Sequence, residues 1–383
     1  MKDAHSTRAG TAALVLTGGG ARAAYQVGLL RCLVRHMPEA PLPIITGVSA
    51  GAINAVHLAA HKGSLREAVD DLTGLWAHLE PGSIYRAGGV ALSGNMLRWG
   101  LRLLSGGSRH GPKVESLLDS EPLRGTLEQA LATVDGEVQG IDENLTDGDL
   151  QAIALSTLNY TTSSTVTWVQ GRGFESWERP RRRGVATRIT IDHIMASAAL
   201  PLVFPAIRLG DSYFGDGGVR LSTPLAPAIH LGADRILAIS TRYRKSREES
   251  RAALVTGYPP PVQVAGNLMN AIFLDAIDQD ARNLKRINQL VRACPDAALG
   301  LRPIKILVLR PSIDLGQLAA EYEPKLPRAF RFLSRGLGTR QTRSPDFLSM
   351  LMFQPDYLTR LIEIGEADAE AQKHEILELL TGD

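Results

Sequence analysis

The chain has 383 residues, which suffices for one large domain or two ordinary ones, each with a substantial core. Apolar residues make up 44% and charged residues 21%, and this composition excludes the disordered and collagen-like classes. The 42 basic and 40 acidic side chains nearly cancel, to a formal charge of +2. Because no basic stripe is present either, we expect no nucleic-acid partner.

The two cysteines, Cys32 and Cys294, are too distant in sequence to form a metal motif or a disulfide framework. We therefore expect no metal site, a buried apolar role for Cys32, and a reducing compartment. Residues 1–10 lack the apolar core of a secretory signal. No run approaches the roughly 20 apolar residues of a spanning helix. The sequence predicts a cytoplasmic protein that at most associates with a membrane surface, and it does not indicate an oligomeric state.

The first elements alternate between strand and helix. Residues 12–16 (AALVL) form a short apolar run of strand length, and residues 23–37 carry leucines at helical spacing. Residues 42–63 (LPIITGVSAGAINAVHLAAHKG) predict a second strand, a sharp turn and a second helix. This order predicts a parallel α/β sheet.

The remaining elements follow in chain order. Residues 64–135 are predicted to be mostly helical with a looser segment at 81–113, and residues 152–169 to form two strands. The later elements are a basic loop at 178–184, a short helix ending before Pro201, a hairpin near 212, helices at 261–293, and a strand at 304–310 followed by mostly helical chain. We divide the chain into a core of residues 12–240 and a helical C-terminal part, 241–383, packed on it.

Residues 47–51 (GVSAG) form a G-x-S-x-G pattern around Ser49, with Gly47 and Gly51 at its ends. Such a nucleophile elbow needs its serine on a tight strand-to-helix turn, and the predicted strand and helix on either side meet that condition. The N-terminus of the helix favours negative charge near the serine. The alternative is a small-residue turn that merely packs a helix on a strand. Only one strand and one helix precede the turn, which differs from the α/β-hydrolase arrangement.

Residues 18–24 (GGGARAA) contain a variant of the dinucleotide fingerprint. That fingerprint needs an acidic residue after the second strand, but here the second strand runs directly into the serine turn. No G-K-[ST] follows, which excludes a P-loop. The remaining role for these glycines is an anion hole, in which the N–H groups of Gly18, Gly19 and Gly20 converge on a reacting oxygen. Arg22 could fix this loop by hydrogen bonds, add positive field, or simply be solvated.

A serine nucleophile needs a proton acceptor, and none of the nine histidines lies in a recognisable motif. Residues 214–219 (FGDGGV) place Asp216 before Gly217 and Gly218 at the end of a predicted strand. An aspartate at a turn is usually a turn former. In a chain with a serine elbow and a glycine loop, Asp216 is a candidate catalytic base.

Three blocks of this sequence together resemble the patatin-like phospholipases. They are residues 16–30 (LTGGGARAAYQVGLL), 47–55 (GVSAGAINA) and 196–233, which begins ASAALPLVFPA and contains FGDGGV. Their order and spacing match the family, and the resemblance covers about residues 12–239. It implies a three-layer α/β sandwich, with a mainly parallel central sheet flanked by helices and a mostly helical C-terminal extension.

The resemblance also implies functional roles. Ser49 and Asp216 match the family's catalytic dyad, which works without histidine, and Gly18 to Gly20 with Arg22 match its oxyanion loop. The family needs no metal and no cofactor. It hydrolyses fatty acyl esters of the phospholipid or lysophospholipid type through an acyl-enzyme. Acyl transfer by the same dyad and a non-catalytic lipid-binding protein are the alternatives, and a dinucleotide enzyme is a more distant one.

Two segments suggest contact with a lipid surface. Residues 90–104 are apolar with Trp99 and two arginines, and they could lie on a membrane or form a core helix. The arginine-rich residues 179–183 could contact anionic head groups or be solvated.

Overall fold

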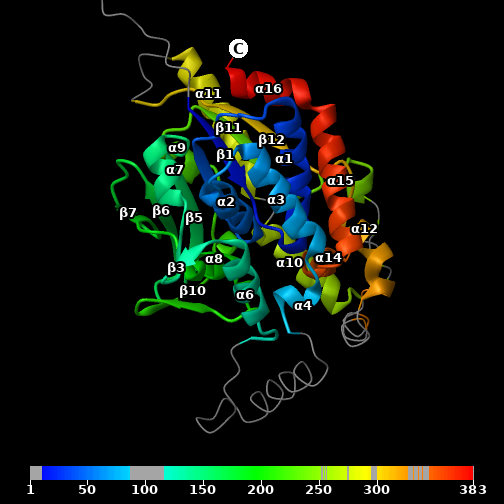
Figure 1. The fold of residues 1–383 in the computed structure, drawn as a ribbon. Helices are drawn as coiled ribbons and strands as arrows, with labels where there is room; N and C mark the ends of the chain where they lie inside the picture. Colours follow the sequence, from blue (N-terminus) through cyan, green and yellow to red (C-terminus); the bar gives the residue numbers. More distant parts are fainter. Residues whose placement is uncertain are drawn as a thin grey trace, which may run out of the picture.

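The computed structural model describes residues 11–86, 116–251, 257–273, 276–294, 300–326 and 345–382, with the single residues 253, 255, 331, 335 and 339. Figure 1 shows a central sheet with helices against it. The strands are β1 (Ala12–Leu16), β2 (Ile44–Val48), β3 (Thr133–Val134), β4 (Glu137–Val138), β5 (Ala152–Asn159), β6 (Ser164–Gly171), β7 (Trp177–Arg179), β8 (Arg182–Ala186), β9 (Ile207–Leu209), β10 (Ser212–Asp216), β11 (Arg235–Ile239) and β12 (Lys305–Leu309).

The described helices lie between and after these strands. They are η1 (Gly20–Ala23), α1 (Ala24–His36), α2 (Ala50–Ala60), α3 (Leu65–His78), α4 (Pro81–Ile84), α6 (Glu121–Ala130), α7 (Ile141–Asp147), α8 (Ile191–Ala198), η2 (Gly217–Val219), α9 (Ala226–His230), η3 (Glu249–Arg251), α10 (Pro261–Phe273), α11 (Ala276–Ala293), α12 (Leu315–Tyr322), η5 (Glu323–Lys325), α14 (Asp346–Leu351), α15 (Pro355–Ala371) and α16 (Lys373–Thr381).

The main sheet has the strand order β12-β11-β1-β2-β5-β6-β8-β7. The strands from β12 to β5 run parallel, and β6 returns antiparallel to β5. β1, β2 and β11 are buried along their whole length, as apolar strands covered on both faces are. The predicted mainly parallel α/β architecture is confirmed.

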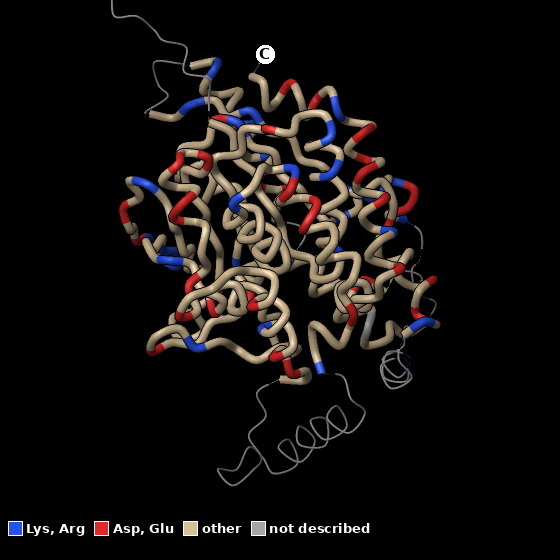
Figure 2. The backbone as a smooth tube through the Cα atoms, viewed as in Figure 1, with Lys and Arg blue, Asp and Glu red and all other residues tan. Residues whose placement is uncertain are grey.

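Alternation along the strands directs side chains into two apolar layers. Leu14 and Leu16 of β1 join a large cluster with α1, α2 and α15, whereas Ala13 and Val15 join a second cluster with α9 and α11. In Figure 1, α1, α2 and α3 lie in front of the sheet, and Figure 2 shows most charged residues around its periphery. The predicted sandwich with helices on both faces, and the helical character of the C-terminal region, are confirmed.

The two segments predicted to contact a lipid surface have different outcomes. The basic stretch 178–184 is not a loop but forms most of the hairpin of β7 and β8. β8 pairs in parallel with the outer edge of β6. Backbone N–H and C=O groups at such an edge need partners, and the backbone of β8 supplies them. The predicted lipid-surface segment 90–104 lies outside the described residues.

The C-terminal region packs directly on the first helix. α15 crosses α1 at two glycines, where the backbones approach closely. A Cβ on Gly28 would overlap the carbonyl of Ile362, and a Cβ on Gly365 would overlap the carbonyl of Tyr25. The residues of α15 therefore belong to the same apolar cluster as those of α1.

This crossing predicts that a glycine-to-alanine substitution is destabilising at Gly365 and stabilising at Gly74, which lies in a helix away from the crossing. We expect Gly365→Ala to lower the free energy of unfolding by about 1–3 kcal/mol, because the backbones must separate. Gly74→Ala in α3 is the matched control, since a Cβ there meets nothing within 4 Å. It should raise stability by about 0.5–1 kcal/mol. Urea denaturation of both variants is the measurement, and equal effects would contradict the close crossing.

Candidate active site

Ser49 and Asp216 are brought together at one edge of β5. β2 pairs with the first part of this strand, up to Val48 opposite Ser156. β10 arrives from the opposite direction, and its last residue, Asp216, lies opposite Thr157. The two strands thus end at neighbouring positions of the same edge. The nearby hydroxyl of Ser49 lowers the pKa of the Asp216 carboxyl.

Ser49 sits in a strained turn. Its backbone has φ 57° and ψ −135°, a region that non-glycine residues rarely adopt and that costs of order 1–3 kcal/mol. The turn is anchored because the N–H of Ser49 donates to Ser197 Oγ at 3.0 Å, and this hydroxyl donates to the carbonyl of Ser156 at 2.8 Å. Side chains larger than hydrogen would not fit at Gly47, which abuts α2, or at Gly51, which abuts the end of β1.

The glycine loop lies against this serine. A Cβ on Gly18 would lie 2.8 Å from the Cβ of Ser49, so the loop backbone is in direct contact with the serine side chain. Gly19 and Gly20 have φ values of 151° and 57°, which glycine adopts readily. None of the three N–H groups donates a hydrogen bond to another described residue. They are free to donate to a ligand.

Two buried side chains hold the loop in place. Thr241 Oγ1 donates to the carbonyl of Gly18 at 2.7 Å. Arg22 is only 2% exposed, and it donates to Asp346 Oδ1 at 2.5 Å and to Ser349 Oγ at 2.6 Å. Of the roles that the sequence leaves open for Arg22, these contacts favour fixing the loop, through α14.

Asp216 is completely buried. Its Oδ1 accepts from the N–H of Gly218 at 2.8 Å, and its Oδ2 has no hydrogen-bond partner among the described residues. Burial raises the pKa of Asp216 to about 7, against the opposing effects of the Ser49 hydroxyl and the Gly218 N–H. Gly217 leaves no room for a side chain because it packs on the carbonyl of Ser156.

No described histidine makes a hydrogen bond to Ser49 or Asp216. His57 lies two turns along α2 from the serine, about 12 Å at 1.5 Å per residue. His193 belongs to the capping box of α8, and its ring packs on Trp168. His230 packs on Trp177.

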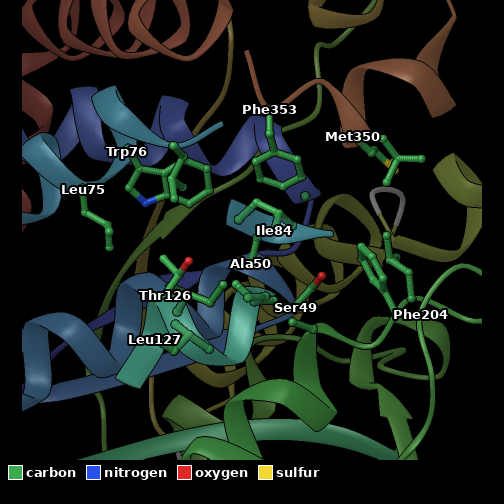
Figure 3. Close-up of a pocket in the computed structure, with 17 residues that line it drawn as sticks. Ser49, Ala50, Leu75, Trp76, Ile84, Thr126, Leu127, Phe204, Met350 and Phe353 are labelled. Atoms are coloured by element: carbon green, nitrogen blue, oxygen red, sulfur yellow. The ribbon is translucent and has the colours of Figure 1, made fainter. Parts of the chain in front are cut away.

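An apolar cavity opens beside Ser49. It encloses about 590 Å³ of empty space, including its opening to solvent. Figure 3 shows Ser49 among the lining side chains, with Leu75 and Trp76 at the end far from Met350 and Phe204. The lining residues come from seven helices, η1 included, and the loops beside them, and they are Gly20, Ser49, Ala50, Ile53, Leu75, Trp76, Leu79, Ile84, Leu123, Thr126, Leu127, Ala198, Leu200, Phe204, Met350, Leu351 and Phe353.

Several residues of this site have no signal in the sequence. Thr241 and Ser349 belong to no motif and are far along the chain from the loop that they support. Met350 and Phe353 belong to a C-terminal region without motifs, yet they form a wall of the cavity. Ser197 alone has a weak signal, as a lone serine in an alanine-rich helix within a resembling block.

One group of described residues could hold a metal ion, and it lies elsewhere. Cys32 and His36, one turn apart at the end of α1, meet Glu370 with ligand atoms within 4.8 Å of one another. His36 Nε2 and Glu370 Oε2 are 2.7 Å apart, and Lys373 donates to the same carboxylate. The start of α1 adjoins the glycine loop, and Cys32 and His36 lie about 12 and 18 Å from that start along the helix axis.

Among the helices that the structure describes, none combines the length and apolar character needed to cross a bilayer.

Comparisons with known proteins show the family of this chain. The model of the family described as patatin-like phospholipase matches residues 14–229, more than half of the chain. No curated protein sequence matches the chain.

Three solved structures are similar to this one. Human GIVD cytosolic phospholipase A2 has a TM-score of 0.49 and 12% identity, over 100% of this chain and 63% of its own. VipD from Legionella pneumophila has a TM-score of 0.42 and 13% identity, over 96% of this chain and 67% of its own. The ExoU–SpcU complex of the Pseudomonas aeruginosa type III secretion system has a TM-score of 0.29 and 15% identity, over 96% and 76%. The chain spans only about two thirds of the first two proteins.

The burial of Asp216 predicts a pH-dependent cost to stability. Its pKa rises from 3.8 to about 7 on folding, so the folded state keeps a proton that the unfolded chain loses. Below about pH 4 Asp216 is protonated in both states, and its ionisation costs the folded state nothing. As the pH rises from about 4 to about 7, the free energy of unfolding falls by up to about 4 kcal/mol. Asp216→Asn cannot ionise. We therefore expect its advantage in free energy of unfolding over the parent to grow between these pH values and then level off. A pH-independent difference in urea denaturation would contradict this.

Proposed function

Since this chain belongs to the patatin-like phospholipase family, we propose that it is a serine-dependent lipid acyl hydrolase that cleaves fatty acyl esters of phospholipids or lysophospholipids. The observation that carries the proposal is the placement of Ser49 beside the buried carboxyl of Asp216, at the wall of an apolar cavity. A strained serine, a proton acceptor, free N–H groups and an apolar cavity are the parts that ester hydrolysis of a lipid requires.

In this proposal Asp216 accepts the proton of Ser49 as the serine oxygen attacks the ester carbonyl. The proton then passes to the leaving alcohol, which departs and leaves the acyl group on Ser49. A water molecule, deprotonated by Asp216, attacks this acyl-enzyme and releases the fatty acid, and the serine regains a proton. An ordinary aspartate is a weak base, but a pKa of about 7 suits general base catalysis near neutral pH.

The negative oxygen that forms during the attack needs hydrogen-bond donors. The backbone of Gly18 lies against Ser49, and Gly20 lines the same cavity. The N–H groups of Gly18 to Gly20 have no partners among the described residues, and we assign them this role. Removing one such donor typically costs about 2.7–4 kcal/mol of transition-state stabilisation. The positive end of α2, which begins at Ala50, adds to the field at the same place. Arg22 contributes by holding the loop.

The acyl chain would occupy the apolar cavity. Its lining is almost entirely aliphatic and aromatic, so the transfer of methylene groups from water is favourable, by about 0.8 kcal/mol each. Leu75 and Trp76 line its end far from Met350 and Phe204. Trp76 is fixed there because its Nε1 donates to Asn54 Oδ1 at 2.7 Å.

The proposed dyad predicts that two substitutions abolish ester hydrolysis while the protein stays folded. Ser49→Ala removes the nucleophile and Asp216→Asn removes the base, so each should lower kcat by at least about 10³-fold. Ser222→Ala and Asp211→Asn, which change exposed residues, are matched controls and should retain activity. The measurement is mass spectrometry of fatty acids released from a mixed lipid extract.

Labelling with a fluorophosphonate provides a second measurement, since it should modify the parent at Ser49 and leave Ser49→Ala unmodified. Full hydrolytic activity of Ser49→Ala would refute the proposal. Acyl esters of added alcohols among the products would show transfer instead of hydrolysis.

The cavity predicts a change in acyl-chain preference. Leu75→Trp adds bulk at the end far from Ser49, so it should exclude long chains and spare short ones. We expect kcat/KM for a long-chain p-nitrophenyl ester to fall roughly tenfold, with little change for the butyrate ester. Leu75→Met keeps the volume and is the control. An equal loss on both esters would place the acyl chain elsewhere.

A further inference from the structure

A second, polar cavity lies on the other side of the glycine loop. This polar cleft encloses about 1320 Å³, including its wide opening to solvent. Basic and amide side chains dominate its lining, and its residues are Arg22, Arg242, Tyr243, Arg244, Lys245, Ser250, Asn267, Asn270, Ala271, Asp278, Arg282, Asp314, Leu315 and Asp346.

The polar cleft lies where the sheet topology favours ligands. Its lining comes from the segments that follow β1, β11 and β12, at the carboxyl ends of these parallel strands. The helix after β1 packs on one face of the sheet, and α11, after β11, packs on the other. The chain therefore departs in opposite directions from two adjacent strands. Open α/β sheets bind ligands in the crevice at such a switch point.

Each acidic residue of the polar cleft is already neutralised. Asp346 binds Arg22, and Lys245 Nζ lies 3.6 Å from Asp314. Asp278 faces two guanidinium groups. That of Arg242 is 3.2 Å away, and that of Arg310, which does not line the cleft, is closer still. The three aspartates therefore add no net negative charge.

Two further cations remain. Arg244 is exposed and makes no hydrogen bond or ion pair with another described residue. Arg282 is exposed too, and it donates only to the neutral Gln279, at 2.9 Å, within the described chain. Two unneutralised guanidinium groups on the walls of one cleft suit an anion with several oxygen acceptors, such as phosphate.

An unsatisfied acceptor accompanies these cations. Asn270 donates through Nδ2 to Asp346 Oδ2 at 2.7 Å, which fixes the orientation of its amide. Its Oδ1 is buried without a hydrogen-bond partner among the described residues. The bond to Asp346 therefore fixes Asn270 on the wall of the polar cleft.

The polar cleft shares its wall with the proposed active site. In η1, Gly20 lines the apolar cavity and Arg22 lines the polar cleft. In α14, Met350 lines the apolar cavity and Asp346 lines the polar cleft. A ligand in the polar cleft would therefore touch the ion pair that holds the glycine loop.

We infer that the polar cleft is a phosphate-binding site, with Arg244 and Arg282 as its principal cationic contacts. The phosphate comes either from the head group of a lipid, a reading that rests on the proposed function, or from a free phosphate compound. Binding itself does not depend on hydrolysis, so it can be tested in protein that lacks the nucleophile.

The first experiment measures binding of inorganic phosphate and of glycerol 3-phosphate to the Ser49→Ala protein by calorimetry. Losing two charge-assisted contacts should weaken binding at least roughly tenfold in the double variant R244Q/R282Q. The control is R208Q/R360Q, which removes two exposed arginines outside the cleft and should bind as the parent does. Absence of binding at millimolar ligand, or an equal loss in the control, would overturn the inference.

The second experiment identifies the source of the phosphate, and it uses protein that retains Ser49. If the head group is bound, R244Q/R282Q should raise KM for a short-chain phosphatidic acid and leave a neutral p-nitrophenyl ester unchanged. If a free phosphate compound is bound, glycerol 3-phosphate should change hydrolysis of the neutral ester by the parent and not by the variant. Binding without any hydrolysis would refute the proposed function alone, and hydrolysis without binding would refute this inference alone.

Discussion

The edge of β5 is the constraint on which the site depends. A strand edge can pair with only one partner at each position, and here β2 and β10 share one edge by ending at adjacent positions, opposite Ser156 and Thr157. Since β2 runs parallel and β10 antiparallel to β5, their last residues approach one another. This pairing brings the turn at Ser49 next to Asp216, although 166 positions of sequence separate the two residues.

Burial then decides what these residues can do. A carboxyl group with no exposed surface resists ionisation, and Asp216 receives one N–H from Gly218 and the influence of the Ser49 hydroxyl as partial compensation. The same burial that costs stability near neutral pH makes the carboxylate a stronger base. Strain at Ser49 is tolerated because Ser197 and the surrounding packing hold the turn.

The glycine loop connects the two cavities. Its backbone faces Ser49, its Thr241 support begins the basic segment after β11, and Arg22 ties it to α14. α14 in turn belongs to the C-terminal region, which is held on the sheet by the close crossing of α15 and α1. The C-terminal region therefore shapes both the apolar wall and the polar cleft, and it is part of the site's architecture.

The sequence by itself determined the order of strands and helices around Ser49, the glycine loop and the turn at Asp216, because these depend on local patterns of apolar, glycine and turn residues. It did not determine the partner of Arg22, the anchor at Ser197, the walls of either cavity, or the meeting of Cys32 with Glu370. The prediction of a loop at residues 178–184 was wrong. Their charged side chains are typical of a loop, but the backbone of β8 pairs with β6. Only the tertiary structure decided these features, since contacts between distant segments follow from register, helix crossing and burial, which no local pattern encodes.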